Sequence, residues 1–404
     1  MIRVPDAWLR KVLGVLYRHR RTTRAEIVHA TQLNVASVSQ TLQYLLSSGA
    51  VIKLGELNSR GGRRRHVLQL NPKAASFVSV DLEGPRIRFA RSNLAGEICR
   101  RWEEEVESGQ SLAVERIVAG VQIVSADSDS LGQAPPLAVG ISHPGLIDKS
   151  GAITAVNLGW ERFPLLEVLQ KRIDLPLFLE RDEQSCILAE RWLGRAQNAE
   201  NWVHLQVGSG VGVGMVIDGH HVRGNDQMAG ELGHIAIAPD ADDLCNCGRR
   251  GCLEAIASAP NIVRQYLEKT GNFDGHPVGS RVAEVFDLAR HGDRAAREVV
   301  ERAGRALGLA MSFVANLLSP ELIVLGGEGL TGADLLLPLI RKEIDQHVLS
   351  PIAQKLTVTT SSLGLDIRLV GGAALAFRHA LSDADLLHKL AGAPAPRIRP
   401  KPAN

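Results

Sequence analysis

Apolar residues recur at helical spacing in the first fifty positions of the chain and predict three consecutive helices. The stripe that marks the first helix, over residues 8–17, consists of Trp8, Val12, Leu13, Val15 and Leu16. The second helix begins at a capping pattern, Thr22 followed by Glu26, and the third runs from Ala36 to Leu46. A turn at 33–34 separates these two helices, which is the spacing of a helix-turn-helix.

The third helix is predicted to present short polar side chains to a partner. Its periodicity places Val38, Leu42, Leu45 and Leu46 inward. The residues expected on the outside are Ser37, Ser39, Gln40 and Gln43. Groups of this kind can reach base edges and phosphates of DNA.

Two alternating runs, 51–54 and 66–70, follow this helix and predict a β-hairpin, the wing of a winged helix. The segment between the runs contains glycines and the arginines Arg60, Arg63, Arg64 and Arg65. Arginine enters narrow minor grooves readily, so these residues are predicted to contact DNA. An ordinary surface loop is the alternative interpretation of this segment taken alone.

The charge of the chain supports DNA binding once it is divided near residue 70. Residues 1–70 hold 12 lysines and arginines against 3 acidic residues, a net charge of +9, whereas the remainder holds 34 against 41, a net charge of −7. A basic head on an acidic body favours a nucleic-acid partner, although basic residues can also form a solvated face.

The body of the chain shows one pattern twice, which predicts two α/β lobes. Strands at 77–82 and 86–91 are separated by a glycine, and strands at 202–207 and 215–217 are separated by the glycine-rich segment 208–214. The last residues, 391–404, are rich in proline and alanine and are predicted to be a disordered tail.

A cluster of thiols in the second half of the chain predicts a metal site. The run Cys245-Asn-Cys247-Gly-Arg-Arg-Gly-Cys252-Leu-Glu254 follows shortly after Glu231-Leu-Gly-His234. Three thiolates and one imidazole form a closed tetrahedral shell for zinc, with no open position for water. We therefore expect one structural zinc ion on His234, Cys245, Cys247 and Cys252.

Together the Glu-x-Gly-His and Cys-x-Cys-Gly-x-x-Gly-Cys-x-Glu segments resemble the signature of the ROK family of repressors, open reading frames and sugar kinases. The basic head with its Gly-Gly-Arg wing is similar to the N-terminal domain of ROK repressors. The resemblance implies an α/β, two-lobed actin-like ATPase (ribonuclease H-like) fold preceded by a winged helix-turn-helix domain. The expected domains are the winged helix at 1–72, a first lobe at 73–183 completed by 365–390, and a second lobe with the zinc site at 184–364.

The resemblance also indicates a phosphate loop that has lost its function. Where ROK kinases have Asp-x-Gly-Gly-Thr, this chain has Asp81-Leu-Glu83-Gly-Pro85. Glu83 brings negative charge to the place of a polyphosphate, and Pro85 removes a hydroxyl and a backbone donor. The glycines of 208–214 and of Val324-Leu-Gly-Gly327 are retained, but glycines also serve tight turns and close packing.

By the same resemblance, Asp182 matches the catalytic base of the kinases, and Arg181 replaces a sugar-binding asparagine. The residues expected to line a sugar site are Asn157, Arg181, Asp182, Glu231, His234 and Glu254. Bracing of the zinc loop is the alternative role for these carboxylates. Arg181 either binds a phosphorylated or acidic sugar, or pairs with Asp182 or Glu180 beside a neutral sugar.

These features predict a sugar-responsive repressor of carbohydrate metabolism genes rather than an enzyme. Its expected partners are operator DNA and a sugar or sugar phosphate, and it is expected to form a homodimer or homotetramer. The apolar stretch at 307–318 is shorter than the roughly 18 residues of a membrane span, so a cytoplasmic protein is expected. The alternatives are an active ATP-dependent sugar kinase with a DNA-binding domain and a repressor controlled by a protein partner.

Overall fold

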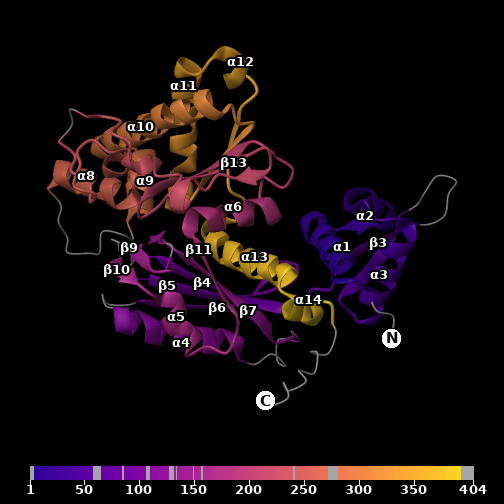
Figure 1. Cartoon of the computed structure of the whole chain (residues 1–404). Coiled ribbons are helices and arrows are strands. Elements are labelled where there is room, and N and C mark those ends of the chain that lie inside the picture. The colour runs from indigo at the N-terminus through magenta and orange to yellow at the C-terminus, as the bar shows by residue number, and fades with distance from the viewer. Residues whose placement is uncertain are drawn as a thin grey trace. The chain divides into compact units, whose positions relative to one another are not determined.

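The computed structural model describes residues 4–57, 65–83, 86–105, 110–126, 132, 134–148, 150–155, 158–239, 242–271 and 281–392. The chain folds as two compact units (Figure 1). The first takes its described residues from 1–144, 151–180 and 369–404, and the second from 145–150 and 181–368. Within the described ranges, no helix is long and apolar enough to cross a membrane.

The first unit begins with three helices and a small sheet. These elements are α1 (Asp6–His19), β1 (Thr22–Thr23), α2 (Arg24–Thr31), α3 (Val35–Ser47), β2 (Val51–Leu57) and β3 (Arg65–Leu70). The strands pair in the order β1-β3-β2. At the start of α2 the Thr23 hydroxyl accepts from the Glu26 N–H while the Glu26 carboxylate accepts from the Thr23 N–H. The predicted helix-turn-helix and hairpin are present in this segment.

One prediction about α3 is wrong. Ser37 was expected outside, but it is 6% exposed, and its carbonyl accepts a hydrogen bond from the buried Thr41 hydroxyl. The buried face of α3 is broader than the stripe of large apolar residues, because a helix that packs on two neighbours buries small polar residues at its margin. The residues exposed at the start of α3 are instead Val35 and Ala36.

A five-stranded sheet of order β11-β7-β4-β5-β6 forms the rest of the first unit. Its strands are β4 (Ser76–Glu83), β5 (Arg86–Asn93), β6 (Ile98–Glu105), β7 (Pro136–His143) and β11 (Leu177–Arg181). Further elements are α4 (Gln110–Ser125), β9 (Ile153–Ala155), β10 (Trp160–Phe163), α5 (Leu165–Gln170), α13 (Ile367–Ser382) and α14 (Ala384–Leu390).

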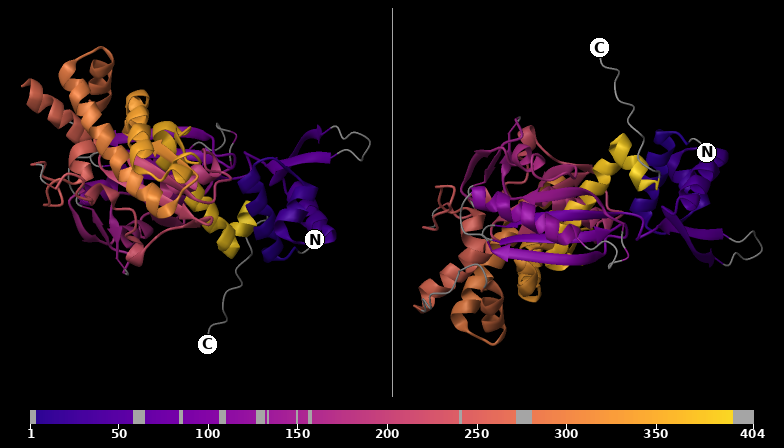
Figure 2. Two further views of the ribbon diagram at one scale, coloured as in Figure 1. Left: turned by 90° about the horizontal axis from the view of Figure 1, so that it is seen from above. Right: turned by 90° about the horizontal axis from the view of Figure 1, so that it is seen from below.

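Helix α13 lies directly on β7 and reaches the N-terminal helices. A Cβ atom at Gly140 would approach the Gly372 carbonyl oxygen to 1.9 Å, so the two backbones meet without side chains between them. Tyr17 of α1 stacks on Phe377 of α13, with ring centroids 4.0 Å apart. Helix α14 then packs along α1, where His388 Nε2 lies 3.2 Å from an Asp6 carboxylate oxygen. Figure 2 shows α13 and α14 in yellow from two further sides.

The prediction of a disordered tail at 391–404 is wrong for its first two residues. Ala391 is buried and caps α14, and the Gly392 N–H donates to the Lys389 carbonyl. These two residues therefore belong to the folded chain, because α14 extends to them. The remainder of that prediction, 393–404, falls outside the described residues.

The second unit is built on a sheet of order β14-β13-β12-β15-β16. The strands of this sheet are β12 (Trp202–Val207), β13 (Val211–Ile217), β14 (His220–His221), β15 (Leu322–Gly326) and β16 (Thr357–Thr360). The short strand β8 (Leu146–Ile147) also belongs to this unit but not to this sheet. The helices are α6 (Asp182–Trp192), α7 (Leu253–Ala257), α8 (Ala259–Thr270), α9 (Val282–Arg290), α10 (Arg294–Leu318), α11 (Ala333–His347) and α12 (Ser350–Ala353). The long α10 packs on α11 and supplies much of one apolar core with β12 and β15.

The two sheets share one topology, which confirms the repeat expected from the sequence. In each, the first strand pairs antiparallel with the second, as in β4–β5 and β12–β13, and parallel with the strand after a helical crossover, as in β4–β7 and β12–β15. The glycine-rich segment departs from expectation, because β13 already begins at Val211, paired with Val207.

Candidate functional sites

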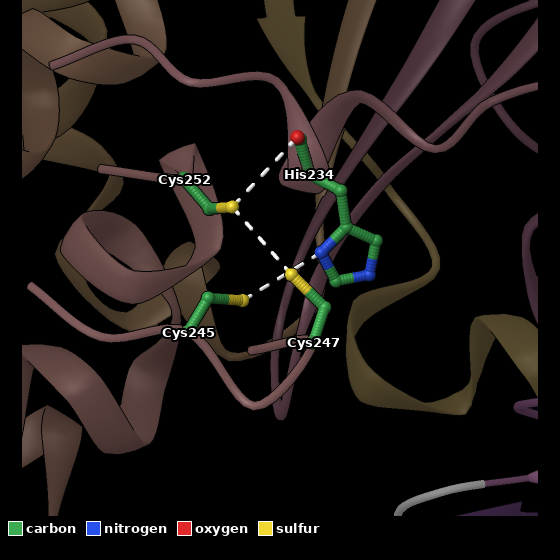
Figure 3. A group of neighbouring side chains, drawn as sticks. All are labelled: His234, Cys245, Cys247 and Cys252. Carbon is green, nitrogen blue, oxygen red and sulfur yellow. Dashed lines mark hydrogen bonds between the residues drawn. The ribbon is translucent and has the colours of Figure 1, made fainter. Parts of the chain in front are cut away.

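The predicted metal ligands lie together in the second unit (Figure 3). The side-chain ligand atoms of His234, Cys245, Cys247 and Cys252 are all within 4.8 Å of one another. Cys245 Sγ is 3.6 Å from His234 Nδ1, and Cys247 Sγ is 3.7 Å from Cys252 Sγ. Cys252 also lies beside the His234 carbonyl oxygen, which holds the two segments together.

These spacings fit a tetrahedral zinc shell. With Zn–S bonds of about 2.3 Å and a Zn–N bond of about 2.0 Å, the edges of the tetrahedron are roughly 3.8 Å between sulfurs and 3.5 Å between sulfur and nitrogen. Burial raises the pKa of Cys245 to about 12, so a thiolate at this position requires a cation beside it. The donor set therefore suits zinc in both geometry and charge.

The two glycines between the cysteines shape the loop. Gly251 has a φ of +70°, and a Cβ there would approach the Ala238 carbonyl oxygen to 2.0 Å. Gly248 has a φ of +84° at the turn after Cys247. Both conformations favour glycine, which explains the Gly-x-x-Gly spacing in the sequence.

Carboxylates connect the cluster of His234 and the three cysteines to its surroundings. Glu254, at the start of α7, accepts a hydrogen bond of 3.2 Å from the Val211 N–H and lies 3.8 Å from Cys245 Sγ. Glu231 places one carboxylate oxygen 3.9 Å from His234 Nε2. Both predicted sugar contacts thus also touch the cluster or a residue that forms it.

Arg181 is held by two carboxylates that were not among its expected partners. Its guanidinium lies 2.5 Å from Glu231 and 3.4 Å from Glu183, and it donates to the Gln227 carbonyl at 2.8 Å. Burial lowers the pKa of Arg181, but Glu183 and Glu231 more than offset this and raise it overall. The residue is 6% exposed, so its charge is buried as well as paired.

Asp182, the matching base position, lies at the first turn of α6. Its carboxylate accepts from the Glu183 N–H at 3.0 Å and lies 3.5 Å from Arg368 at the start of α13. Burial raises the pKa of Asp182 well above its ordinary value and Glu183 raises it further, while Arg368 and Arg181 offset only part of the effect. Asn157, the remaining predicted sugar contact, lies outside the described residues.

The segment expected as the first phosphate loop carries its own cation. Asp81 is fully buried and forms an ion pair of 2.5 Å with Arg88 across the β4–β5 pair, and Arg88 also lies 3.4 Å from Glu83. A carboxylate at a phosphate loop ordinarily helps to hold Mg²⁺ with the phosphates. Here a guanidinium neutralises it instead. Pro85 lies outside the described residues.

The retained glycines of the second unit have packing roles. A Cβ at Gly212 would lie 2.5 Å from a Glu183 carboxylate oxygen, and one at Gly214 would lie 2.6 Å from Ile187 Cγ1. A Cβ at Gly326 would lie 2.5 Å from the His204 ring. Close packing of β13 on α6 and of β15 on β12 therefore accounts for these glycines without a nucleotide.

A groove runs along α3 in the first unit, and we call it the basic groove after Arg24 and Lys53, although six of its lining residues are apolar. Its volume is about 920 Å³, and its lining consists of Thr23, Arg24, Ala25, Val28, Val35, Ser39, Leu42, Gln43, Leu46, Ser47, Lys53, His66 and Leu68. No carboxylate is among these residues. Ser39 accepts a hydrogen bond from Arg24, and Gln43 is exposed. Of the other predicted DNA contacts, Gln40 is half-buried, Arg65 starts β3, and Arg60, Arg63 and Arg64 lie outside the described residues.

Three cationic or titratable residues of this groove were not among the expected DNA contacts. Arg24 is the first residue of α2, directly after its cap, and Lys53 and His66 lie on the two strands of the wing. The alternation of the wing strands contained this signal, because every second residue faces the same side of a hairpin. Only the order of α2, α3 and the hairpin in space brings the three together.

The family model and the similar proteins cover different parts of this chain. The sequence model of the ROK family matches residues 77–379. A glucokinase of Halalkalibacterium halodurans is 32% identical and is covered over 93% of its length, but it accounts for only 73% of this chain. A xylose repressor of Caldicellulosiruptor bescii is 30% identical over 83% of this chain and 86% of its own length.

A solved structure extends the likeness to nearly the whole chain. The crystal structure of a ROK family transcriptional regulator, described as a homolog of the E. coli MLC protein, superposes with a TM-score of 0.78 at 26% identity. It covers 96% of this chain and 98% of its own. The regulator thus matches the N-terminal helices together with the two α/β lobes, which share the actin-like fold.

Proposed function

Because the chain belongs to the ROK family, we propose that it is a sugar-responsive transcriptional repressor, with operator DNA bound by its N-terminal winged helix. The observation that carries this proposal is the winged helix itself, which has a basic groove along α3 and no carboxylate in its lining. The match to the glucokinase covers only 73% of this chain, whereas the match to the regulator structure covers 96% of it.

The effector in this proposal is a neutral sugar, bound near Asp182, Glu231 and Glu254. Two buried guanidiniums, Arg181 and Arg368, supply positive charge in this region. Arg181 is already paired with Glu183 and Glu231, and Arg368 faces Asp182. Even with Asp182 protonated, the carboxylates of Glu183 and Glu231 balance the two guanidiniums and leave no excess positive charge for a phosphate. Carboxylates readily accept hydrogen bonds from sugar hydroxyls.

Calorimetry with matched free and phosphorylated sugars tests the effector. We expect binding of at least one free sugar and no tighter binding of its phosphate. The substitution Arg181→Asn should weaken binding of the free sugar, because it releases Glu231 from its ion pair. Preferential binding of a sugar phosphate that is lost in Arg181→Asn would contradict a neutral effector and would assign Arg181 to anion binding.

Structural zinc is the second part of the proposal. His234, Cys245, Cys247 and Cys252 would hold one ion, which would fix the loop that carries Glu231 and Glu254. Elemental analysis should find about one zinc per chain. Cys247→Ser should lose the metal and lower the melting temperature, because metal binding energy is folding energy in such loops. Cys99→Ser, on β6 of the other unit, is the matched control and should keep both.

An ATP-dependent sugar kinase is the competing function, because glucokinases are among the relatives. The pairing of Asp81 and Glu83 with Arg88 speaks against it, since nucleotide phosphates would meet two carboxylates whose cation is already present. Purified protein should show no appreciable ATP-dependent phosphorylation of common hexoses. Replacing Glu83 by glycine together with Pro85→Thr should improve nucleotide binding. Robust turnover by the wild-type protein would sink the proposal of a pure regulator.

We further propose that the repressor is a homodimer or a homotetramer, since a two-fold symmetric protein matches a palindromic operator. Phe313 and Leu317 lie one turn apart on α10 and are 45% and 81% exposed, and Leu349 is 68% exposed. Large apolar side chains of this exposure favour an interface. Light scattering of the wild type and of Leu317→Arg should give a multimer and a smaller species, respectively.

A further inference from the structure

The first turn of α3 presents methyl groups rather than hydrogen-bonding groups. Val35 is the first residue of the helix and is 56% exposed, and Ala36 beside it is also exposed. Asn34 uses its side-chain oxygen to cap the helix, accepting from the Ser37 N–H at 2.8 Å. Ser37 itself is turned into the core.

This arrangement lies on the surface that DNA would occupy. Val35 lines the basic groove together with Arg24, Lys53 and His66. The groove contains the cations Arg24 and Lys53 and no carboxylate, so its charge fits a polyanion, while its apolar lining can cover methyl groups. In helix-turn-helix proteins the N-terminal residues of the recognition helix contact base edges in the major groove.

Among the four bases, thymine alone presents a methyl group in the major groove. A branched aliphatic side chain at the start of the helix has no donor or acceptor for any other base edge. It gains free energy by covering that methyl group, since both surfaces leave water.

We propose that Val35, supported by Ala36, is a specificity-determining residue that selects thymine in each half-site of the operator through contact with the C5-methyl group. This inference rests on the proposed DNA binding through α3, and it replaces the polar readout that Ser37 would have supplied. Gln40 and Gln43, further along the helix, remain available for hydrogen bonds to neighbouring bases.

The test uses the full-length protein and DNA selected from a random library. Each thymine of the selected site is replaced in turn by uracil, which removes only the methyl group. We expect one thymine per half-site at which uracil weakens binding about three- to fivefold, the effect of one buried methyl group. In Val35→Ser the same replacement should change affinity less than twofold, and Val35→Thr, which keeps one methyl group and the shape, should retain part of the effect.

Two controls keep the result interpretable. Leu112→Ser removes a comparably exposed apolar side chain on α4 and should leave the uracil effect unchanged. Melting temperatures should stay within a few degrees for all variants, because Val35 is outside the core. Uracil tolerated at every thymine, or a uracil effect that persists in Val35→Ser, would overturn the inference while leaving DNA binding intact. Failure to select any DNA would contradict the proposed function, and this inference would fall with it.

Discussion

Asp182 illustrates how several neighbours decide the protonation of one carboxyl group. Arg368 and Arg181 favour the carboxylate, while burial and the nearby Glu183 favour the protonated acid, and the second pair of effects dominates. A protonated carboxyl group can both donate and accept hydrogen bonds with a sugar hydroxyl, and it must lose its proton before it can act as a general base.

The first prediction concerns stability and pH. In the folded chain Asp182 keeps its proton at pH values where the unfolded chain has lost it, so the free energy of unfolding falls as pH rises from the unfolded pKa to the folded pKa. Asp182→Asn removes this loss. The variant should be more stable than wild type at pH 7.5 by on the order of 1 kcal/mol, and the gain should shrink as pH falls toward 4.

Urea unfolding of both proteins at several pH values measures the difference, in which effects of pH on the metal site cancel. Asp242→Asn, at an exposed carboxylate of the same unit, is the control and should bring no comparable gain at pH 7.5. If Asp182→Asn were instead less stable at pH 7.5, its ion pair with Arg368 would outweigh the cost of burial.

At the scale of elements, motifs with strict spacing were predictable from the sequence, but the first residue of a strand was not. The strict spacing of the Cys-x-Cys-Gly-x-x-Gly-Cys run predicted that its three thiols would lie together with His234, as they do. The start of β13 did not, because Gly212 and Gly214 read as loop residues. They are strand residues whose missing side chains leave room for Glu183 and Ile187 of α6. Such tertiary packing is invisible in a local pattern.

Two glycine substitutions should therefore have opposite effects. Gly214→Ala places a Cβ 2.6 Å from Ile187 Cγ1 and should lower the free energy of unfolding by about 2 kcal/mol through overpacking. Gly14→Ala, inside α1, meets only Leu381 at 3.9 Å and should raise it by roughly 0.5–1 kcal/mol through helix propensity. Denaturant unfolding checks both.

Ile187→Val in the Gly214→Ala background should recover part of the loss, because it removes a methyl group from the crowded site. Equal stability of Gly214→Ala and wild type would show that β13 and α6 are less tightly packed than their glycines indicate.

At the scale of the whole molecule, the charge division predicted the basic head, but nothing in the sequence predicted how the head is held. Tyr17 of α1 stacks on Phe377, which also makes an edge contact with Phe77 of β4. Helix α13 thus contacts α1 of the winged helix through Phe377. At the start of the same helix, Arg368 lies near Asp182. The residues of this connection are far apart in the chain, and only the fold brings them together.

In the proposed repressor, this connection would link sugar binding to the winged helix. Tyr17→Leu keeps an apolar side chain but loses the ring stack, so it should leave DNA affinity without sugar nearly unchanged. The change in DNA affinity on sugar binding, typically 5- to 150-fold in coupled systems, should fall at least threefold. Fluorescence anisotropy with and without the sugar measures it. Tyr266→Leu, on α8, is the control, and unaltered coupling in Tyr17→Leu would exclude the stack from the response.

The length of α13 fixes the distance between these two contacts. Phe377 comes nine positions after Arg368, which is about 13 Å of continuous helix. A tilt of about 10° at the first turn would move the far end by roughly 2 Å, while the rings of Tyr17 and Phe377 stack with centroids 4.0 Å apart. In the proposed repressor, such a tilt would carry a change at the Arg368–Asp182 pair to the ring stack over a distance fixed by the number of helical residues, whatever the identity of the sugar.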